Sequence, residues 1–239
     1  MIILKFLFSL FFWVYIQLGI LLVLILSLPA NLLPNRGRAF NYALAKLLLR
    51  LLFFISFFRI RLKSGQKVGL VNREILIANK PDLLSTFALI ISLPRQVRFV
   101  AAENIFYIPF FGWLLKAIGC IPAGKKLGGP LGFAVSVMAA MKQNEAVLFY
   151  PRNLRRFNGR VSEFKPGEIS VARSAGATLL PLVVTGTKKL IKRGSVLLWP
   201  GAIEITVHEP VTPAELGSVD TVMARLTRLY QGELPFEGD

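Results

Sequence analysis

The stretch that decides the fold is Ile75-Leu76-Ile77-Ala78-Asn79-Lys80-Pro81-Asp82-Leu83-Leu84-Ser85. It begins with a short apolar run, passes through a polar turn that contains a proline, and continues as a second apolar run through Thr86-Phe87-Ala88-Leu89-Ile90. The first run predicts a buried strand and the second a helix, because the proline separates them into two elements. A strand followed directly by a helix is typical of an α/β domain.

Beyond this unit the chain alternates short β-like runs with helical ones. Further strands are expected over Val97–Ala101, Ala146–Tyr150, Thr178–Thr185, Val196–Trp199 and Ala202–His208. Helices are expected over Leu83–Ser92, Pro109–Ile118, Leu131–Lys142, Glu168–Ser174 and Pro213–Tyr230. This alternation predicts an α/β sheet flanked by helices on both faces. The 239 residues suffice for one such domain with a full core.

The N-terminal part of the chain is its most apolar region. Phe6 to Leu28 is a run of 23 residues without a charge, which is long enough to cross the hydrocarbon core of a bilayer as a helix. The run is too long for the core of a signal peptide, and no small-residue cleavage site follows it. We therefore expect a retained membrane helix.

A second apolar stretch, Ala39 to Phe58, carries two basic residues inside it. Lys46 and Arg50 are four residues apart and share one helix face, which favours the membrane interface, with a second span as the alternative. Together the two stretches predict a membrane-anchoring two-helix module over residues 1–58. The α/β domain is then expected over residues 59–239.

The net charge of +16 indicates an anionic partner. With an N-terminal anchor, an anionic membrane lipid explains this charge better than nucleic acid, for which the sequence holds no recognition motif. Lys5 precedes the first helix, whereas the basic residues that follow the apolar region are Arg36, Arg38, Arg59, Arg61 and Lys63. This asymmetry predicts a membrane protein with its domain on the cytoplasmic face. One cysteine, Cys120, and one histidine, His208, exclude an internal disulfide and a Cys/His metal cluster.

Four sequence blocks follow one another at regular spacing. They are Asn79 to Ser85; Glu103 to Lys125, which contains Pro109-Phe110-Phe111-Gly112-Trp113; Phe149 to Arg155 with Phe164-Lys165-Pro166-Gly167 after it; and Leu179 to Val184 with its embedded proline. In this order they resemble the glycerolipid acyltransferase family, which makes phosphatidate from lysophosphatidate. The resemblance extends from Ile75 to about Val211. It implies the fold of that family, an acyl-CoA or acyl-carrier-protein donor, a lysophospholipid acceptor and no cofactor.

The first block departs from the family at both reactive positions. The family motif reads Asn-His-x-x-x-x-Asp, and here Lys80 stands on the histidine and Ser85 on the aspartate. In the family the histidine is the general base, and the aspartate orients its imidazole. A lysine with an ordinary pKa near ~10.4 is protonated at neutral pH and accepts no proton, and serine carries no charge. The resemblance therefore implies an acyltransferase whose chemistry is severely impaired.

The basic residues of the second and third blocks remain. Lys125 falls on a family arginine and Gly124 on a family aspartate; in the third block Arg152 replaces a glutamate, Asn153 replaces a glycine, and Arg155 falls on a family arginine. The resemblance makes Lys125, Arg152, Asn153 and Arg155 the candidate ligands of the substrate phosphate, and guanidinium groups suit that role. A solvated basic loop is the alternative.

Two functions from different classes fit this pattern. The first is a membrane-bound lysophosphatidate acyltransferase of phospholipid biosynthesis with weakened catalysis. The second is a non-catalytic lipid-binding or regulatory protein that keeps the fold. Lys80 and Ser85 are the positions that separate the two functions. Natural divergence and deliberate substitution of these positions would give the same sequence.

Overall fold

The structure is a computed structural model. It describes residues 2–30, 36–64, 73–79, 82–124, 129–143, 145–151, 156–157, 160–161, 166–192, 195–212, 214–215 and 218–233. The elements follow in the order α1 (Ile2–Ala30), α2 (Arg36–Ile55), β1 (Arg59–Ser64), β2 (Glu74–Ala78), α3 (Leu83–Ser92), β3 (Val97–Ala102), η1 (Glu103–Tyr107), α4 (Phe111–Ala117), β4 (Ile121–Ala123), α5 (Gly129–Lys142), β5 (Ala146–Phe149), β6 (Arg156–Phe157), β7 (Arg160–Val161), α6 (Pro166–Ser174), β8 (Thr178–Thr185), α7 (Thr187–Leu190), β9 (Ala202–Val207) and α8 (Val219–Glu233).

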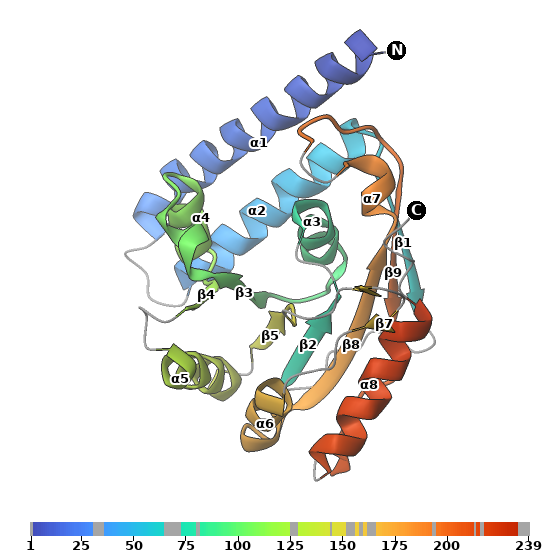
Figure 1. Cartoon of the computed structure of the whole chain (residues 1–239). Helices are drawn as coiled ribbons and strands as arrows, with labels where there is room; N and C mark the ends of the chain where they lie inside the picture. Colours follow the sequence, from blue (N-terminus) through green and yellow to red (C-terminus); the bar gives the residue numbers. More distant parts are fainter. Residues whose placement is uncertain are drawn as a thin grey trace.

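The core of the molecule is a seven-stranded sheet in the order β1-β9-β8-β2-β5-β3-β4 (Figure 1). β8 and β9 pair antiparallel, and the other neighbouring strands pair parallel. The strand β2 lies between β8 and β5. Because the carboxyl ends of parallel strands share one edge of a sheet, the residues that follow β2, β5 and β3 meet at that edge, where ligands bind in many α/β proteins.

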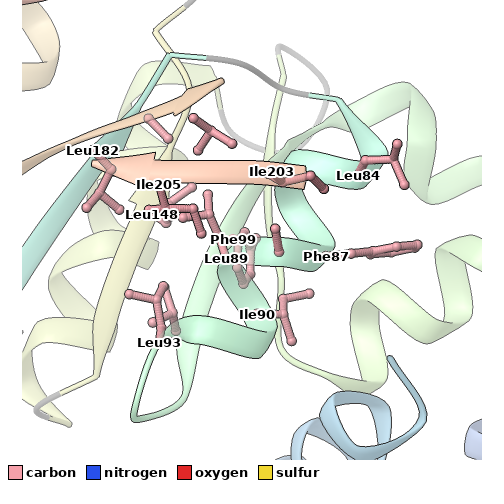
Figure 2. Packing of buried hydrophobic residues seen from close by; sticks show 14 of the residues in the cluster. Leu84, Phe87, Leu89, Ile90, Leu93, Phe99, Leu148, Leu182, Ile203 and Ile205 are labelled. Atoms are coloured by element: carbon pink, nitrogen blue, oxygen red, sulfur yellow. The ribbon is translucent and has the colours of Figure 1, made fainter. Parts of the chain in front are cut away.

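Helices cover both faces of the sheet, as the alternation of elements predicts. Along β2 the side chains alternate between the two faces: Leu76 and Ala78 join one buried cluster, and Ile75 and Ile77 join the other. The first cluster contains residues of α1, α2 and α3, and the second contains residues of α5, α6 and α8 (Figure 1). Figure 2 shows how α3 packs its apolar side onto the strands in the first cluster. The fold is therefore the α/β fold expected from the sequence.

The helix α1 is attached to the domain along its length. In its N-terminal half, Ser9 Oγ accepts a hydrogen bond from the Leu198 amide at 2.9 Å, and Trp13 Nε1 donates one to the Val196 carbonyl at 2.8 Å. Phe12 between them is fully buried. Further along, α1 packs against α2 and α4. Much of the opposite side of α1 exposes large apolar residues.

One strand expected from the sequence is wrong. Residues 196–199 form no regular strand; Leu198 makes one isolated bridge to Ile191, because the backbone of this segment bonds to side chains of α1 instead. Lys46 and Arg50 share one face of α2, and both donate hydrogen bonds to carbonyl oxygens at the end of α3. Those carbonyls lack partners within their own helix, and the negative end of the helix dipole attracts cations.

Candidate functional site

An apolar cavity of about 630 Å³ lies at the carboxyl edge of β2. Side chains of α1, α2, α3 and α4 form most of its wall, and the ends of β2, β3 and β5 close it on the side of the sheet. The polar residues in the lining are Tyr15, Asn79, Asp82, Thr86, Cys120 and Tyr150. The first sequence block therefore supplies polar groups to a cavity whose remaining surface is largely hydrocarbon.

Asn79 fixes the turn that follows β2. Its side-chain amide donates to the Val184 carbonyl at 3.0 Å and accepts from the Val184 amide at 2.7 Å. The backbone ladder between β2 and β8 ends at Ala78 and Leu182, so the Asn79 side chain continues the ladder one step further while the main chain turns away. The asparagine of the motif thus ties the end of β2 to β8 through two buried hydrogen bonds.

Asp82 is the N-cap of α3. Its Oδ1 accepts the Ser85 amide at 2.7 Å, and its Oδ2 accepts the Thr187 hydroxyl at 2.9 Å. Capping carboxylates satisfy amides that would otherwise have no partner in the first helical turn. The hydrogen bond to Thr187 joins the start of α3 to the start of α7, 105 residues later in the chain. The family aspartate is missing at position 85, but a carboxyl group therefore lies one helical turn earlier and lines the cavity.

Ser85 is fully buried and does not line the cavity. Its hydroxyl has no hydrogen-bond partner among the residues that the structure describes. A buried hydroxyl without a partner is destabilising, so Ser85 makes no contact that explains its presence at this position. Lys80, the other substituted position of the motif, lies outside the described residues.

Tyr150 and Cys120 face the cavity from the end of β5 and from the residue before β4. The Tyr150 hydroxyl and Thr86 Oγ1 are hydrogen-bonded at 2.8 Å, and Thr86 Oγ1 also donates to the Asp82 carbonyl at 2.9 Å. Burial raises the pKa of Tyr150 well above its ordinary value and raises the pKa of the Cys120 thiol to about 12. Both groups are therefore neutral at physiological pH, and Cys120 is no nucleophile there.

The structure leaves no space for a side chain at Gly124, where the family has an aspartate. A Cβ added at Gly124 would overlap the side chain of Glu103, whose carboxylate accepts the Tyr107 hydroxyl at 3.3 Å. Glu103 begins η1, directly after β3. The space beside position 124, where the family has an aspartate, is thus filled by an acidic side chain from another part of the chain.

The candidate phosphate ligands Lys125, Arg152, Asn153 and Arg155 lie outside the described residues. Two described residues just before these segments, Ala123 and Pro151, both line the cavity.

Sequence reasoning missed several residues of this site. Pro81-Asp82 before an apolar run is a recognisable N-cap signal for Asp82. The position of Thr86 on the cavity side of α3 follows from its spacing to Asp82, four residues earlier. Thr187 carries no signal of its own in the sequence, because its contact with Asp82 is produced by the folding of β8 next to β2.

The fold and this site define an α/β domain of acyltransferase type. Residues 73–185 match the family model described as Acyltransferase. The chain is 26% identical to the chloroplastic 1-acyl-sn-glycerol-3-phosphate acyltransferase of Arabidopsis thaliana over 198 residues, which are 80% of this chain and 54% of the relative. It is 24% identical to the Bacillus subtilis 1-acyl-sn-glycerol-3-phosphate acyltransferase over 123 residues, 52% of this chain and 58% of the relative.

A similar fold occurs in the crystal structure of the 1-acyl-sn-glycerophosphate acyltransferase of Thermotoga maritima. The two structures superpose with a TM-score of 0.70 at 20% identity, and the match covers 98% of each chain. Together, the family model and these relatives support a glycerolipid (1-acylglycerol-3-phosphate) acyltransferase family for this chain. The chain spans about half the length of the curated relatives that it matches, 54% for the Arabidopsis thaliana protein and 40% for the Brassica napus 1-acyl-sn-glycerol-3-phosphate acyltransferase.

Proposed function

We propose that this protein transfers an acyl group from a thioester donor, acyl-CoA or acyl-carrier protein, to the hydroxyl of a lysophosphatidate-like acceptor. The observation that carries the proposal is the cavity of about 630 Å³, which joins a hydrocarbon lining to the polar groups of the first motif. Its volume falls within the range of about 300–1,000 Å³ that is usual for ligand sites. The apolar wall suits an acyl chain, and the polar end suits the reacting thioester and hydroxyl.

The reaction requires a group that accepts a proton. As the acceptor oxygen bonds to the thioester carbonyl carbon, its hydroxyl proton must leave, and the C–S bond then breaks to release the thiol. Lys80 and Ser85 cannot do what histidine and aspartate do in the family. Asp82 is the only carboxyl group among the described residues that line the cavity, and we assign to it whatever base catalysis remains. Loss of a well-placed base typically slows a reaction by about 10²–10⁴-fold.

The phosphate of the acceptor is assigned to Lys125, Arg152, Asn153 and Arg155. This assignment rests on the order of the sequence blocks, in which the basic positions of the family remain basic. Arginine binds phosphate through paired N–H donors, so Arg152 and Arg155 would contribute orientation as well as charge.

The test is acyl transfer from a labelled thioester to lysophosphatidate by the purified protein and by a Lys80→His/Ser85→Asp double variant. We expect slow transfer by the parent protein and faster transfer by the double variant. An Asp82→Asn variant of the parent should lose the slow transfer but keep its thermal stability, because asparagine is as good an N-cap as aspartate. Unchanged transfer in Asp82→Asn would refute the role of Asp82 alone, whereas no transfer by either parent or double variant would refute acyl transfer.

The second candidate function is a non-catalytic lipid-binding or regulatory protein, and the substitutions at Lys80 and Ser85 favour it. Lysophosphatidate that binds to the parent protein without turnover would support it. Restored transfer in the double variant would then show that the site was once catalytic.

We place the protein at a membrane, with the α/β domain on the cytoplasmic face. The helix α1 contains one stretch, Ile3–Pro29, that is long and apolar enough to cross a bilayer. The net charge of +16 supports contact with anionic lipid. Because the cytoplasmic leaflet carries a negative surface potential, this charge supports the cytoplasmic face whether or not α1 crosses the bilayer.

A further inference from the structure

A second apolar depression lies between the C-terminal half of α1 and α4. It is a groove of about 570 Å³, lined by Leu21, Leu24, Ile25, Ser27, Leu28, Phe110, Trp113, Lys116 and Ala117. None of these residues lines the cavity of the candidate active site. Other residues of α4, among them Phe111 and Leu114, line that cavity, so α4 forms a wall between the two. The groove is thus a separate feature on the outside of the molecule.

Two aromatic side chains form one side of the groove. Phe110 and Trp113 pack edge to face with ring centroids 5.3 Å apart, yet 51% of Phe110 and 55% of Trp113 remain exposed. The backbone of Phe110 has a φ of +61°, a conformation that bulky residues rarely adopt. Tyr107 and Ile108 beside them are also exposed. An exposed apolar patch of this kind usually marks a contact with another molecule.

The occupant can be identified from the surroundings of the groove. The same side of α1 continues as exposed apolar surface, through residues such as Leu18, Leu22 and Ile25. Tryptophan prefers the level of the lipid headgroups, and a lysine next to apolar surface reaches toward anionic headgroups while its stem stays in hydrocarbon. We propose that the groove holds one acyl chain of an anionic bilayer phospholipid, with Trp113 at the headgroup level and Lys116 beside the phosphate.

This site does not depend on acyl transfer, because it shares no lining residue with the cavity. It adds the start of α4 to the membrane-contacting surface that the apolar side of α1 provides. Since α4 is also a wall of the cavity, lipid in the groove would hold the α/β domain at a fixed orientation to the bilayer.

The experiment uses Trp113 as its reporter. The chain has three tryptophans, so a Trp13→Phe/Trp199→Phe variant leaves the emission of Trp113 alone. Vesicles of phosphatidylglycerol with brominated acyl chains should quench this emission strongly, and unbrominated vesicles should shift it to shorter wavelength. Emission that stays unquenched while the protein sediments with the vesicles would overturn the proposal. A blue shift that depends on protein concentration without lipid would also overturn it, because a second copy of the chain would then cover the groove.

Matched variants test the two chemical contacts. Trp113→Glu should lower the affinity for anionic vesicles by about tenfold or more, since burial of an aromatic side chain is lost. Lys116→Gln should weaken binding to anionic vesicles but not to phosphatidylcholine vesicles. Val135→Glu is the control: Val135 is 60% exposed on α5, which covers the opposite face of the sheet. Equal losses of vesicle affinity for Trp113→Glu and Val135→Glu would refute the lipid site. Acyl transfer is measured separately in detergent, so that a failure of the lipid site can be told apart from a failure of the proposed activity.

Discussion

Asn79 shows how one side chain can fix a functional turn. Replacement by alanine would remove both hydrogen bonds to Val184 and leave the amide and carbonyl of a buried residue without partners. Each unsatisfied buried group costs roughly 1–3 kcal/mol, so the two groups should lower the free energy of unfolding of Asn79→Ala by roughly 2–6 kcal/mol. Denaturant unfolding in detergent measures this change.

The control for this substitution is Gln143→Ala. The side-chain amide of Gln143 also forms a hydrogen bond, because its Oε1 accepts from Arg38 Nη2 at 3.0 Å, but this bond is exposed to solvent. Surface substitutions of this kind usually change stability by less than about 0.5 kcal/mol. Similar losses in the two variants would show that Asn79 does not hold the turn.

Cys120 gives the protein a dependence on alkaline pH. Burial raises the pKa of its thiol from 9.0 to about 12. Above pH 9 the unfolded chain therefore releases this proton while the folded chain keeps it, so the free energy of unfolding decreases as the pH rises, by up to about 1.4 kcal/mol per pH unit. Denaturant unfolding between pH 9 and pH 10 should show this slope, before the buried Tyr42, Tyr150 and Tyr230, whose pKa values are also raised by burial, add their own contributions above 10.0.

A Cys120→Ala variant should lose the part of the pH dependence of the free energy of unfolding that the thiol causes. The free energy of unfolding at neutral pH serves as the reference for each protein, because the thiol is neutral there in both the folded and the unfolded chain. Equal slopes in the parent and in Cys120→Ala would mean that the thiol is not shielded in the cavity.

At the residue scale, the sequence predicts polar contacts only where they are local. The motif led to Asn79 and Ser85, whereas the cap Asp82 was missed although Pro81-Asp82 before an apolar run is a local signal for it. The sequence also identified Cys120 as a lone thiol, but its burial at the cavity depends on how β4 and α4 pack. Thr187 could not be predicted, because its bond to Asp82 joins two positions 105 residues apart. A local sequence pattern predicts contacts between residues that are close in the chain, whereas this site is formed by residues that are far apart in the chain.

The helix α4 depends on a close approach to the preceding η1 turn. A Cβ added at Gly112 would overlap the backbone carbonyl of Phe106. Backbone cannot move aside as a flexible side chain does, so Gly112→Ala should displace α4 and lower the free energy of unfolding by about 1–3 kcal/mol. Thermal unfolding in detergent would register the loss.

Gly232→Ala in α8 provides the comparison, because no atom lies within 4 Å of a Cβ added at Gly232. There alanine should stabilise the helix slightly, by about 0.5–1 kcal/mol, since glycine is a poor helix former. Changes of opposite sign in the free energy of unfolding of Gly112→Ala and Gly232→Ala would confirm the close contact in α4. Changes of the same sign would contradict it.

At the element scale, patterning works best for elements that bury a continuous apolar run. The predicted bounds of Leu83–Ser92 and Thr178–Thr185 match α3 and β8. The strand predicted over Val196–Trp199 is wrong, although its composition is apolar, because side chains of α1 bond its backbone. In the edge strand β1, Arg59–Ser64, basic residues alternate with other residues, and from the sequence we noted the basic residues but predicted no strand. In both segments, strand formation depends on which neighbouring segment the fold places beside the backbone.

At the scale of the whole molecule, α1 packs along the α/β domain and exposes much of its other side as apolar surface. The sequence predicts a two-helix membrane-anchoring module over residues 1–58 and an α/β domain over residues 59–239, and the structure contains the helices α1 and α2 and a seven-stranded sheet. It does not reveal that the helix lies along the domain, because the contacts of Ser9 and Trp13 are made with a segment more than 180 residues later. As a consequence α1 forms a wall of the candidate active-site cavity on one side and part of the groove next to α4 on the other.

This packing bears on the topology of α1 in the membrane. The helix has 29 residues and is therefore about 43 Å long, more than the hydrocarbon core of about 30 Å. If α1 crossed the bilayer, residues 196–198 would have to follow Ser9 and Trp13 through it. We therefore predict that α1 lies along the membrane surface and that both its ends are on the side of the α/β domain.

Cysteine labelling decides between the two topologies. In a Cys120→Ala background, Leu4→Cys reports on the N-terminal end of α1, and Glu209→Cys reports on the domain; both positions are exposed. A membrane-impermeant maleimide should label both cysteines from the same side of sealed vesicles, and neither from the other side. Labelling of Leu4→Cys from the side opposite to Glu209→Cys would mean that α1 crosses the bilayer, and the hydrogen bonds of Ser9 and Trp13 to residues 196–198 would then be absent in the membrane-bound protein.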